Sequence, residues 1–360
     1  MKFLLSAYTG LGNFILKTPL IRAIHQQFSG AQVDLLCGAP FGTERVLQGS
    51  RWISRTHWCP HDCSFVEKLR MLKALRRERY DVVLLPFDST PGYLRNGIHL
   101  IGAKRIVSHV HLTKAQAKQK LIIGLRLLQS FEHCWVPVLI GRHECDLNLD
   151  LLEPLLAKPC KRDLQTFVHW GPEDISSFKL PKKYCVIQPG ASNGSPTPKT
   201  WDPRNFGKVI LQVKKDFPTL QFAMVGDRGD AVALEEAGLL TENVINLLGK
   251  TTFNQLCNVL NGAELVLSHD SGIMHIANAM QKPLIALYGP TDFTRTMPLS
   301  SSSHMLFSRN ECWAKMYAFR EGEADLMDRF PSYYCMSDIT VGQVVSFVRG
   351  ILKDDLKLSL

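Results

Sequence analysis

The sequence predicts an α/β protein made of two doubly wound domains, each with a parallel sheet between layers of helices. Short apolar runs alternate with helical patterns through both halves of the chain. The length of 360 residues exceeds what one hydrophobic core usually serves, which favours two domains. Several expected strands run directly into loops rich in glycine and serine, where sheets of this kind bind their ligands.

In the first half, continuous apolar segments mark the expected strands and amphipathic spacing marks the helices. The expected strands lie at 3–6, 32–36, 81–87 and 105–108, and the expected helices at 14–27, 64–78, 114–128 and 144–156. Phe65, Leu69, Leu72 and Leu75 recur at helical spacing in the second of these helices. Because the strand segments are mostly apolar, we expect helices to cover them on both faces.

The second half repeats the alternation. The expected strands lie at 184–188, 220–225, 244–246, 264–268 and 283–288, and the expected helices at 202–215, 230–236, 253–260 and 271–280. After Tyr288 the pattern weakens until a last helix at about 341–352. A repeated βαβ series in each half implies two separate parallel sheets.

The pattern is interrupted near 165–182 by glycine and proline, which marks the expected join between domains. We therefore expect an N-terminal domain at 1–170 and a C-terminal domain at 182–337. A terminal helix at 338–360 is expected to pack back on the N-terminal domain.

The net charge of +9 is concentrated in the first half of the chain. Residues 1–165 hold 23 Lys and Arg against 13 Asp and Glu, a balance of +10, and the remainder carries 19 against 20. This imbalance fits either a solvated basic face or an anionic partner such as nucleic acid, phosphorylated lipid or a membrane surface. Composition alone does not choose among them.

The chain shows neither a membrane-spanning segment nor a secretory leader pattern. No apolar run approaches the ~20 residues that a spanning helix needs. The apolar stretch at the N-terminus is short and lacks the usual cleavage pattern. We therefore expect a cytoplasmic protein. The ten cysteines include no CxxC pair, which predicts that most are buried thiols.

His57, Cys59, His61 and Cys63 are four potential metal ligands within seven residues. Alternate residues of an extended strand point the same way but lie about 6.5 Å apart, so a strand cannot gather all four around one ion. A bent loop could do so, but the spacing is not that of a zinc finger. We expect no metal site there.

The first glycine-bearing loop spans 8–14, directly after the first expected strand. Gly10 and Gly12 would let a ligand approach the backbone, and the following helix N-terminus favours an anion. The loop is a poor dinucleotide fingerprint, because the third glycine would fall at Ile15. A nicotinamide dehydrogenase is therefore disfavoured, and a tight turn without a ligand stays an alternative.

Two further loops carry phosphate-binding chemistry in the second half. The loop after 184–188 offers Ser192 and Lys199, a hydroxyl and a point charge that suit a diphosphate. The loop after 264–268 contains Asp270 and Ser271, either of which can cap the next helix. The backbone N–H groups at the start of that helix form a ready anion site. A capped helix with a buried His275 is the alternative interpretation.

The chain reads Ser268-His269-Asp270-Ser271-Gly272-Ile273-Met274-His275, and then Lys282-Pro283 and Tyr288-Gly289-Pro290-Thr291-Asp292. Together these segments resemble the signature of glycosyltransferase family 9, which includes the lipopolysaccharide heptosyltransferases. The resemblance extends, in order, to segments 12–23, 189–201, 248–252 and 335–336. An ordered match along almost the whole chain is more specific than any one loop.

The resemblance implies a GT-B fold, with two Rossmann-like domains facing each other across a cleft. It implies an inverting transfer of a sugar, typically heptose from ADP-heptose, onto a lipopolysaccharide core or related surface glycan, with no metal or other cofactor. Carried over by position, the donor would contact Ser192, Lys199, Asp270, Ser271, Gly272, Ile273 and His275. Asp227 or Asp230 would hold the ribose. An anionic glycolipid acceptor would suit the basic N-terminal half and peripheral contact with the inner membrane.

One position departs from the family. Members commonly carry an aspartate base directly after the glycine of the first loop, where this chain has Asn13, and a carboxamide has no useful basicity. Asp88, at the end of the strand at 81–87, is the substitute base that we would test first. The alternatives are transfer without a strong base, with Asn13 orienting the hydroxyl, and a catalytically silent sugar-nucleotide-binding homologue. Nucleic-acid binding ranks below both, because no recognition motif accompanies the basic half.

Overall fold

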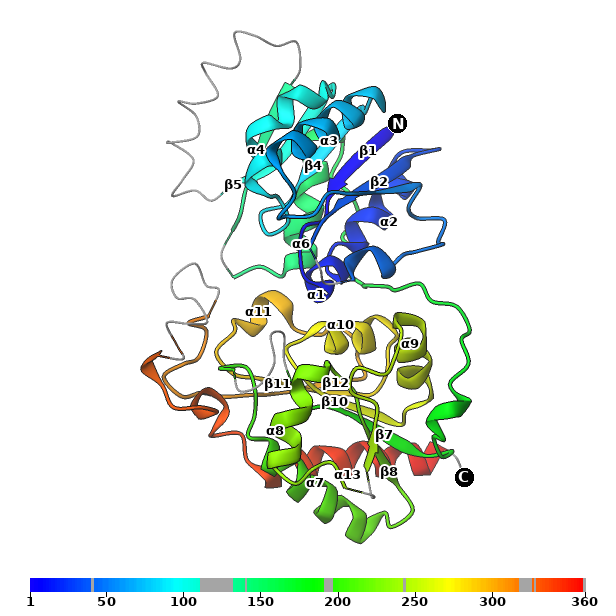
Figure 1. Cartoon of the computed structure of the whole chain (residues 1–360), viewed down its shortest axis with the longest axis vertical. Coiled ribbons are helices and arrows are strands. Elements are labelled where there is room, and N and C mark those ends of the chain that lie inside the picture. Colours follow the sequence, from blue (N-terminus) through cyan, green and yellow to red (C-terminus); the bar gives the residue numbers. More distant parts are fainter. Residues whose placement is uncertain are drawn as a thin grey trace. The chain divides into compact units, whose positions relative to one another are not determined.

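The chain folds into two compact units, Met1–His169 and Trp170–Leu360, which are described separately below. The computed structural model describes residues 1–39, 42–110, 132–139, 141–190, 197–241, 244–316, 326 and 328–358. The expected helix at 114–128 and the site residue Ser192 lie outside this part of the chain. Each unit consists of one sheet with helices packed on it (Figure 1).

The first unit is built on a six-stranded, fully parallel sheet in the order β3-β2-β1-β4-β5-β6. Its strands are β1 (Lys2–Ser6), β2 (Gln32–Cys37), β3 (Arg55–Trp58), β4 (Val82–Leu85), β5 (Arg105–Val110) and β6 (Glu132–Pro137). Its helices are α1 (Leu11–Ile15), α2 (Thr18–Gln27), α3 (Phe65–Arg77), α4 (Gly92–Gly97) and α6 (Glu144–Leu149). The central strands β1 and β4 are buried on both faces, as their apolar sequences require.

The second unit repeats this plan with the strand order β12-β11-β10-β7-β8-β9, again fully parallel. Its strands are β7 (Tyr184–Gln188), β8 (Gln221–Met224), β9 (Val244–Asn246), β10 (Leu265–His269), β11 (Leu284–Tyr288) and β12 (Ser303–Phe307). Its helices are α7 (Pro203–Asp216), α8 (Ala231–Glu236), α9 (Phe253–Gly262), α10 (Gly272–Ala279), α11 (Phe293–Thr296) and α13 (Val341–Leu358). Figure 1 shows α7 and α13 on one face of this sheet and α9 and α10 on the other.

Numbered within its own unit, each sheet has the order 3-2-1-4-5-6 of a Rossmann fold. The order reverses between β1 and β4 in the first unit and between β7 and β10 in the second. Ligands of such sheets bind beyond the carboxyl ends of the strands at these reversal points. The two doubly wound domains predicted from the sequence are therefore confirmed, and each has one position where a site is expected.

Several boundaries differ from the sequence prediction for local reasons. The expected helix at 14–27 is two helices, because the chain turns at Leu16 and Lys17 and Pro19 takes the first turn of α2. The expected helix at 144–156 becomes 3₁₀ from Asp150, in the stretch that contains Pro154. The sequence analysis did not include β3, β6 and β12. These are sheet-edge strands, and the polar residues of β3 and the partial exposure of β12 explain why their patterns are weak.

The terminal helix α13 completes the core of the second unit. Val344, Val345, Val348 and Leu352 are buried in the same cluster as residues of α7, and α13 also packs near β10 and β11. The sequence analysis expects this helix to return to the N-terminal domain, whereas these contacts all lie in the second unit. Helix α13 belongs to the second unit because its apolar side chains pack against those of α7.

Among the residues that the structure places, no helix has the length and apolar character needed to cross a bilayer.

Candidate functional site

Two loops meet at the reversal point of the second sheet, beyond the ends of β7 and β10. Lys199, from the loop after β7, places its Nζ 3.2 Å from Oδ2 of Asp270, which follows β10. His275 on α10 lies on the other side of this carboxylate, with Nε2 3.8 Å from Asp270 Oδ1. The structure therefore brings together three residues that the sequence analysis assigned to a donor site.

The carboxylate of Asp270 is held in its charged form. Burial by itself would raise the pKa of Asp270, but the nearby charges of Lys199 and His275 outweigh burial and lower it below the ordinary value. The site thus pairs a fixed negative charge with a lysine whose side chain is still 18% exposed.

The start of α10 has no side-chain cap. Ser271 occupies the N-cap position, but its hydroxyl donates to Gln188 Oε1 at 3.0 Å and lies 3.1 Å from Ser268 Oγ, and it makes no capping bond. The prediction that Asp270 or Ser271 caps this helix is therefore wrong. Within the described residues, no side chain caps the helix that begins at Gly272 and Ile273, and the dipole of this helix favours an anion at its first N–H groups.

His269 ties the two loops together. It is fully buried at the end of β10; the Trp201 backbone N–H donates to its Nε2 at 2.9 Å, and its Nδ1 lies 3.0 Å from the Gly190 carbonyl. Nε2 accepts, so Nδ1 carries the proton and the imidazole is neutral. Burial lowers the pKa of His269 to about 4, which keeps it neutral at physiological pH. The sequence analysis gave this residue no separate role.

Asp227 and Asp230 differ sharply in their surroundings. Asp227 is exposed, whereas Asp230 is 2% exposed and lies so close to Gly190 that a Cβ there would overlap its carboxylate. Asp230 Oδ2 accepts from the Asp227 backbone N–H at 3.2 Å, and burial raises the pKa of Asp230 to about 6. Of the two ribose candidates, only Asp227 presents its carboxylate to solvent.

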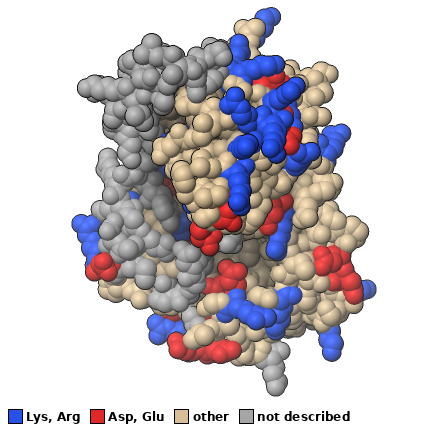
Figure 2. Space-filling model, turned by 45° about the horizontal axis from the view of Figure 1, so that its top comes forward, with Lys and Arg blue, Asp and Glu red and all other residues tan. Residues whose placement is uncertain are grey.

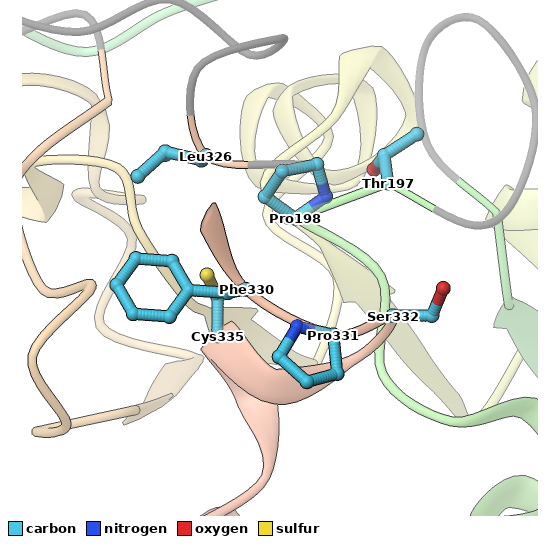
Figure 3. A pocket seen from close by; sticks show the side chains of 7 residues that line it. All are labelled: Thr197, Pro198, Leu326, Phe330, Pro331, Ser332 and Cys335. Carbon is cyan, nitrogen blue, oxygen red and sulfur yellow. The ribbon is translucent and has the colours of Figure 1, made fainter. Parts of the chain in front are cut away.

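A small pocket lies beside the Lys199 loop. It is lined by Thr197, Pro198, Leu326, Phe330, Pro331, Ser332 and Cys335. Figure 3 shows Thr197 and Pro198 on one side, with Phe330 and Cys335 on the other. Cys335 forms a disulfide with Cys312, a pairing that the sequence analysis did not foresee. The spacing of 23 residues gave no signal for it, because only the fold brings the two Cα atoms to 5.3 Å.

The first unit carries a comparable pair at its own reversal point. Lys17, whose side chain is completely buried, places Nζ 2.7 Å from Asp88 Oδ2 and donates to the Asn13 carbonyl at 3.0 Å. Burial alone would raise the pKa of Asp88, but the charge and hydrogen bond of Lys17 and the Ser89 hydroxyl lower it below its usual range. Asn13 and Asp88 are therefore connected through Lys17, which the sequence analysis missed. A lysine directly after the apolar run Phe14-Ile15-Leu16 was the available signal.

The histidine and cysteine cluster near β3 does not converge on one point. His57 Nε2 lies 2.8 Å from the Tyr80 hydroxyl, whereas Cys59 Sγ faces Cys63 Sγ at 3.4 Å. The ring of His61 packs edge-on against Tyr8. Across the described parts of the chain, no three His, Cys, Asp or Glu side chains are arranged to hold a metal ion.

Comparisons with known proteins show what this chain is similar to. The family model "Glycosyltransferase family 9 (heptosyltransferase)" matches residues 143–321, which include Lys199, Asp270 and His275. Lipopolysaccharide heptosyltransferase 3 of Escherichia coli K12 is 24% identical over 363 residues, covering 96% of each chain. The chain belongs to glycosyltransferase family 9. The resemblance found in the sequence is thereby confirmed, and the chain is a glycosyltransferase.

Solved structures give the same fold for this family 9 protein. The family 9 glycosyltransferase of Veillonella parvula aligns with a TM-score of 0.75 at 18% identity, covering 98% of this chain and 97% of that one. The E. coli ADP-heptose lps heptosyltransferase II aligns with a TM-score of 0.69 at 18% identity, covering 99% of each. The predicted GT-B class, with two Rossmann-like domains, is confirmed.

Proposed function

We propose that this chain is an inverting heptosyltransferase that moves heptose from ADP-heptose onto a lipopolysaccharide core or a related surface glycan. The observation that carries the proposal is the uncapped N-terminus of α10 beside Lys199 and Asp270. Free N–H groups and an ammonium together suit a diphosphate. A solved neighbour is named for ADP-heptose and a curated relative for lipopolysaccharide, which supports the choice of donor and acceptor.

In this proposal the second unit binds the donor. The backbone N–H groups of Gly272 and Ile273 and the Lys199 ammonium contact the diphosphate, with Ser192 on the same loop as Lys199. Asp270 and His275 flank the sugar, and Ser271 holds the loop through Gln188. As the bond between the heptose C1 and the phosphate oxygen breaks, negative charge grows on the departing ADP. Lys199 and the helix N-terminus stabilise that charge in the transition state.

The first unit supplies the group that receives the acceptor proton. The acceptor oxygen attacks C1 from the side opposite ADP, forms the new C–O bond and gives up its proton. Asp88 is ionised by Lys17 and can accept it, although the lowered pKa makes Asp88 a weaker base than a solvated aspartate. Lys17 donates to the backbone carbonyl of Asn13, and in this proposal the Asn13 carboxamide orients the hydroxyl.

The test is transfer from ADP-heptose to heptose-deficient lipopolysaccharide, followed by product mass and ADP release. Asp88→Asn is expected to lower kcat at least a hundredfold. A variant without its buried carboxylate leaves Lys17 unpaired, so Lys17→Met/Asp88→Asn is the folding control. If Asp88→Asn keeps its rate while Asn13→Asp raises it, Asp88 is not the base.

A measurement of donor binding distinguishes an active transferase from a catalytically silent homologue. Calorimetry with ADP-heptose is expected to show binding that Lys199→Ala weakens, and UDP-glucose serves as the control donor. Binding of ADP-heptose without turnover on any lipopolysaccharide acceptor would favour the catalytically silent homologue. No binding of any ADP-sugar would refute the heptose assignment.

A further inference from the structure

Helix α3 exposes large apolar side chains at its N-terminal end. Phe65 is 72% exposed, Val66 53% and Leu69 41%. The sequence analysis grouped Phe65 and Leu69 with Leu72 and Leu75 as one apolar face, but only Leu72 and Leu75 are buried in the core. The first two turns of α3 therefore carry apolar surface that the fold of this unit does not use.

The position of α3 is fixed by contacts that leave this surface open. Ser64 and Glu67 form a capping box at its start, with the Glu67 backbone N–H donating to Ser64 Oγ and Glu67 Oε2 accepting from the Ser64 backbone N–H. Leu72 and Leu75, further along the helix, anchor it in the core. A capped and anchored helix presents its outer residues as a rigid face.

Basic side chains follow the apolar ones along the same side of α3. Arg70, Lys73 and Arg77 are exposed, and at 3.6 residues per turn they share about 140° of the helix circumference with Phe65, Val66 and Leu69. In the described part of the chain, no carboxylate lies within ion-pair distance of these three. The nearest acidic residue in the helix, Glu67, is engaged in the capping box. Figure 2 shows Lys and Arg gathered on a face of the first unit.

We propose that this face of α3, formed by Phe65, Val66, Leu69, Arg70, Lys73 and Arg77, binds the surface of an anionic phospholipid bilayer. The apolar side chains enter the boundary between headgroups and acyl chains, and the basic ones meet lipid phosphates. A nucleic acid would meet the charges but would leave Phe65 and Leu69 against its phosphates. A second copy of the chain would bring Lys73 and Arg77 against like charges. The charge and the apolar content together therefore favour a bilayer.

This interface deepens the proposed function, because a glycolipid acceptor is held in a membrane, but its test needs neither donor nor acceptor. The full chain is sedimented with vesicles of phosphatidylglycerol and phosphatidylcholine, and with vesicles of phosphatidylcholine alone. Binding is expected only to the anionic vesicles and is expected to fall as NaCl rises from 50 to 500 mM. Each basic residue near such a surface is worth about fivefold in partitioning.

Two variants test the two chemistries of the face, each with a matched control in the second unit. Phe65→Ser/Leu69→Ser is expected to weaken binding at least tenfold, whereas Leu211→Ser/Val232→Ser, at exposed apolar positions of the second unit, leaves it unchanged. Lys73→Gln/Arg77→Gln is expected to weaken it more than tenfold, whereas Lys208→Gln/Lys215→Gln does not. Circular dichroism and thermal unfolding verify that all four variants fold.

Several results would overturn the interface. The first is a wild-type chain that stays in the supernatant with anionic vesicles at 50 mM NaCl. The second is an equal loss of binding in the test and control variants. The third is binding to uncharged vesicles that is as strong as binding to anionic ones. Duplex DNA that competes the chain off the vesicles and binds it independently of Phe65 and Leu69 would assign the face to nucleic acid. A dimer that Phe65→Ser/Leu69→Ser dissociates would assign it to a second copy. Transfer onto a deacylated, water-soluble acceptor should be unchanged in the α3 variants, so failed transfer and failed binding are distinguishable.

Discussion

The two units place a lysine and an aspartate at the same topological position, but they use the pair differently. Lys17–Asp88 and Lys199–Asp270 each join the segment after a unit's first strand to the end of its fourth. The first pair is tighter, at 2.7 Å, and its lysine is fully buried and also bonded to the Asn13 carbonyl. The second is 3.2 Å long with its lysine 18% exposed. The first pair is enclosed by the first unit, whereas the lysine of the second pair is partly exposed.

Removing the exposed lysine should have the largest effect on activity. Lys199→Ala is expected to lower kcat/KM about a hundredfold to a thousandfold, because the ammonium stabilises charge that grows only as ADP departs. Because the buried Asp270 also loses a cationic neighbour, unfolding in urea should show a loss of stability as well, so the rates are compared at a temperature where the variant stays folded. The rate of heptose transfer at subsaturating ADP-heptose is the measurement, and Lys208→Ala on α7 is the control. Similar losses in both variants would contradict a specific role for Lys199.

Removing the buried lysine should instead affect the fold. Lys17→Met leaves Asp88 buried without its partner, so the free energy of unfolding is expected to fall by about 3 kcal/mol. Lys17→Met/Asp88→Asn should recover most of that loss, because no uncompensated charge remains. Urea denaturation of the single and double variants measures the difference. If Lys17→Met is as stable as the parent chain, the Lys17–Asp88 pair does not stabilise the first unit.

A third prediction concerns the buried acid beside the donor loops. Burial raises the pKa of Asp230 to about 6, so the folded chain binds a proton there that the unfolded chain has already lost above its ordinary pKa near 3.8. Proton binding to Asp230 in the folded chain therefore stabilises the fold below about pH 4, and this stabilisation is lost as the pH rises through 6. Asp230→Asn is therefore expected to stabilise the chain by about 2 kcal/mol at pH 7.5, and by little at pH 4. Thermal unfolding across this range tests it, and an equal effect at both pH values would exclude titration as the cause.

The sequence predicted the centre of each sheet better than its edges. The segments of β1, β4, β7 and β10 are mostly apolar because helices cover both of their faces, and this leaves a clear pattern. The edge strands β3, β6 and β12 have polar or half-exposed side chains, so their sequences resemble those of loops. Periodicity reports burial, and a strand that is only partly buried carries little of that signal.

The sequence indicated the residues of the candidate site that lie together in one loop. It did not indicate residues that are far apart in the sequence and that only the fold brings into contact. Asp270, Ser271 and His275 form a local motif, and Lys199 is part of the ordered resemblance. Nothing near Lys17 in the sequence indicates Asp88, which lies 71 residues away. The roles of Ser271 and His269 also depend on Gln188, Gly190 and Trp201, which only the pairing of β7 with β10 brings near.

Trp201 links the donor loop to the last helix of the chain. Its backbone N–H donates to His269, and its indole N–H donates to the Ile339 carbonyl at 2.9 Å, just before α13 begins. A chain still on the ribosome, with α13 not yet emerged, would lack both this bond and the apolar residues that finish the second core. We therefore expect the loop that carries Lys199 to take its final form only after α13 has been synthesised.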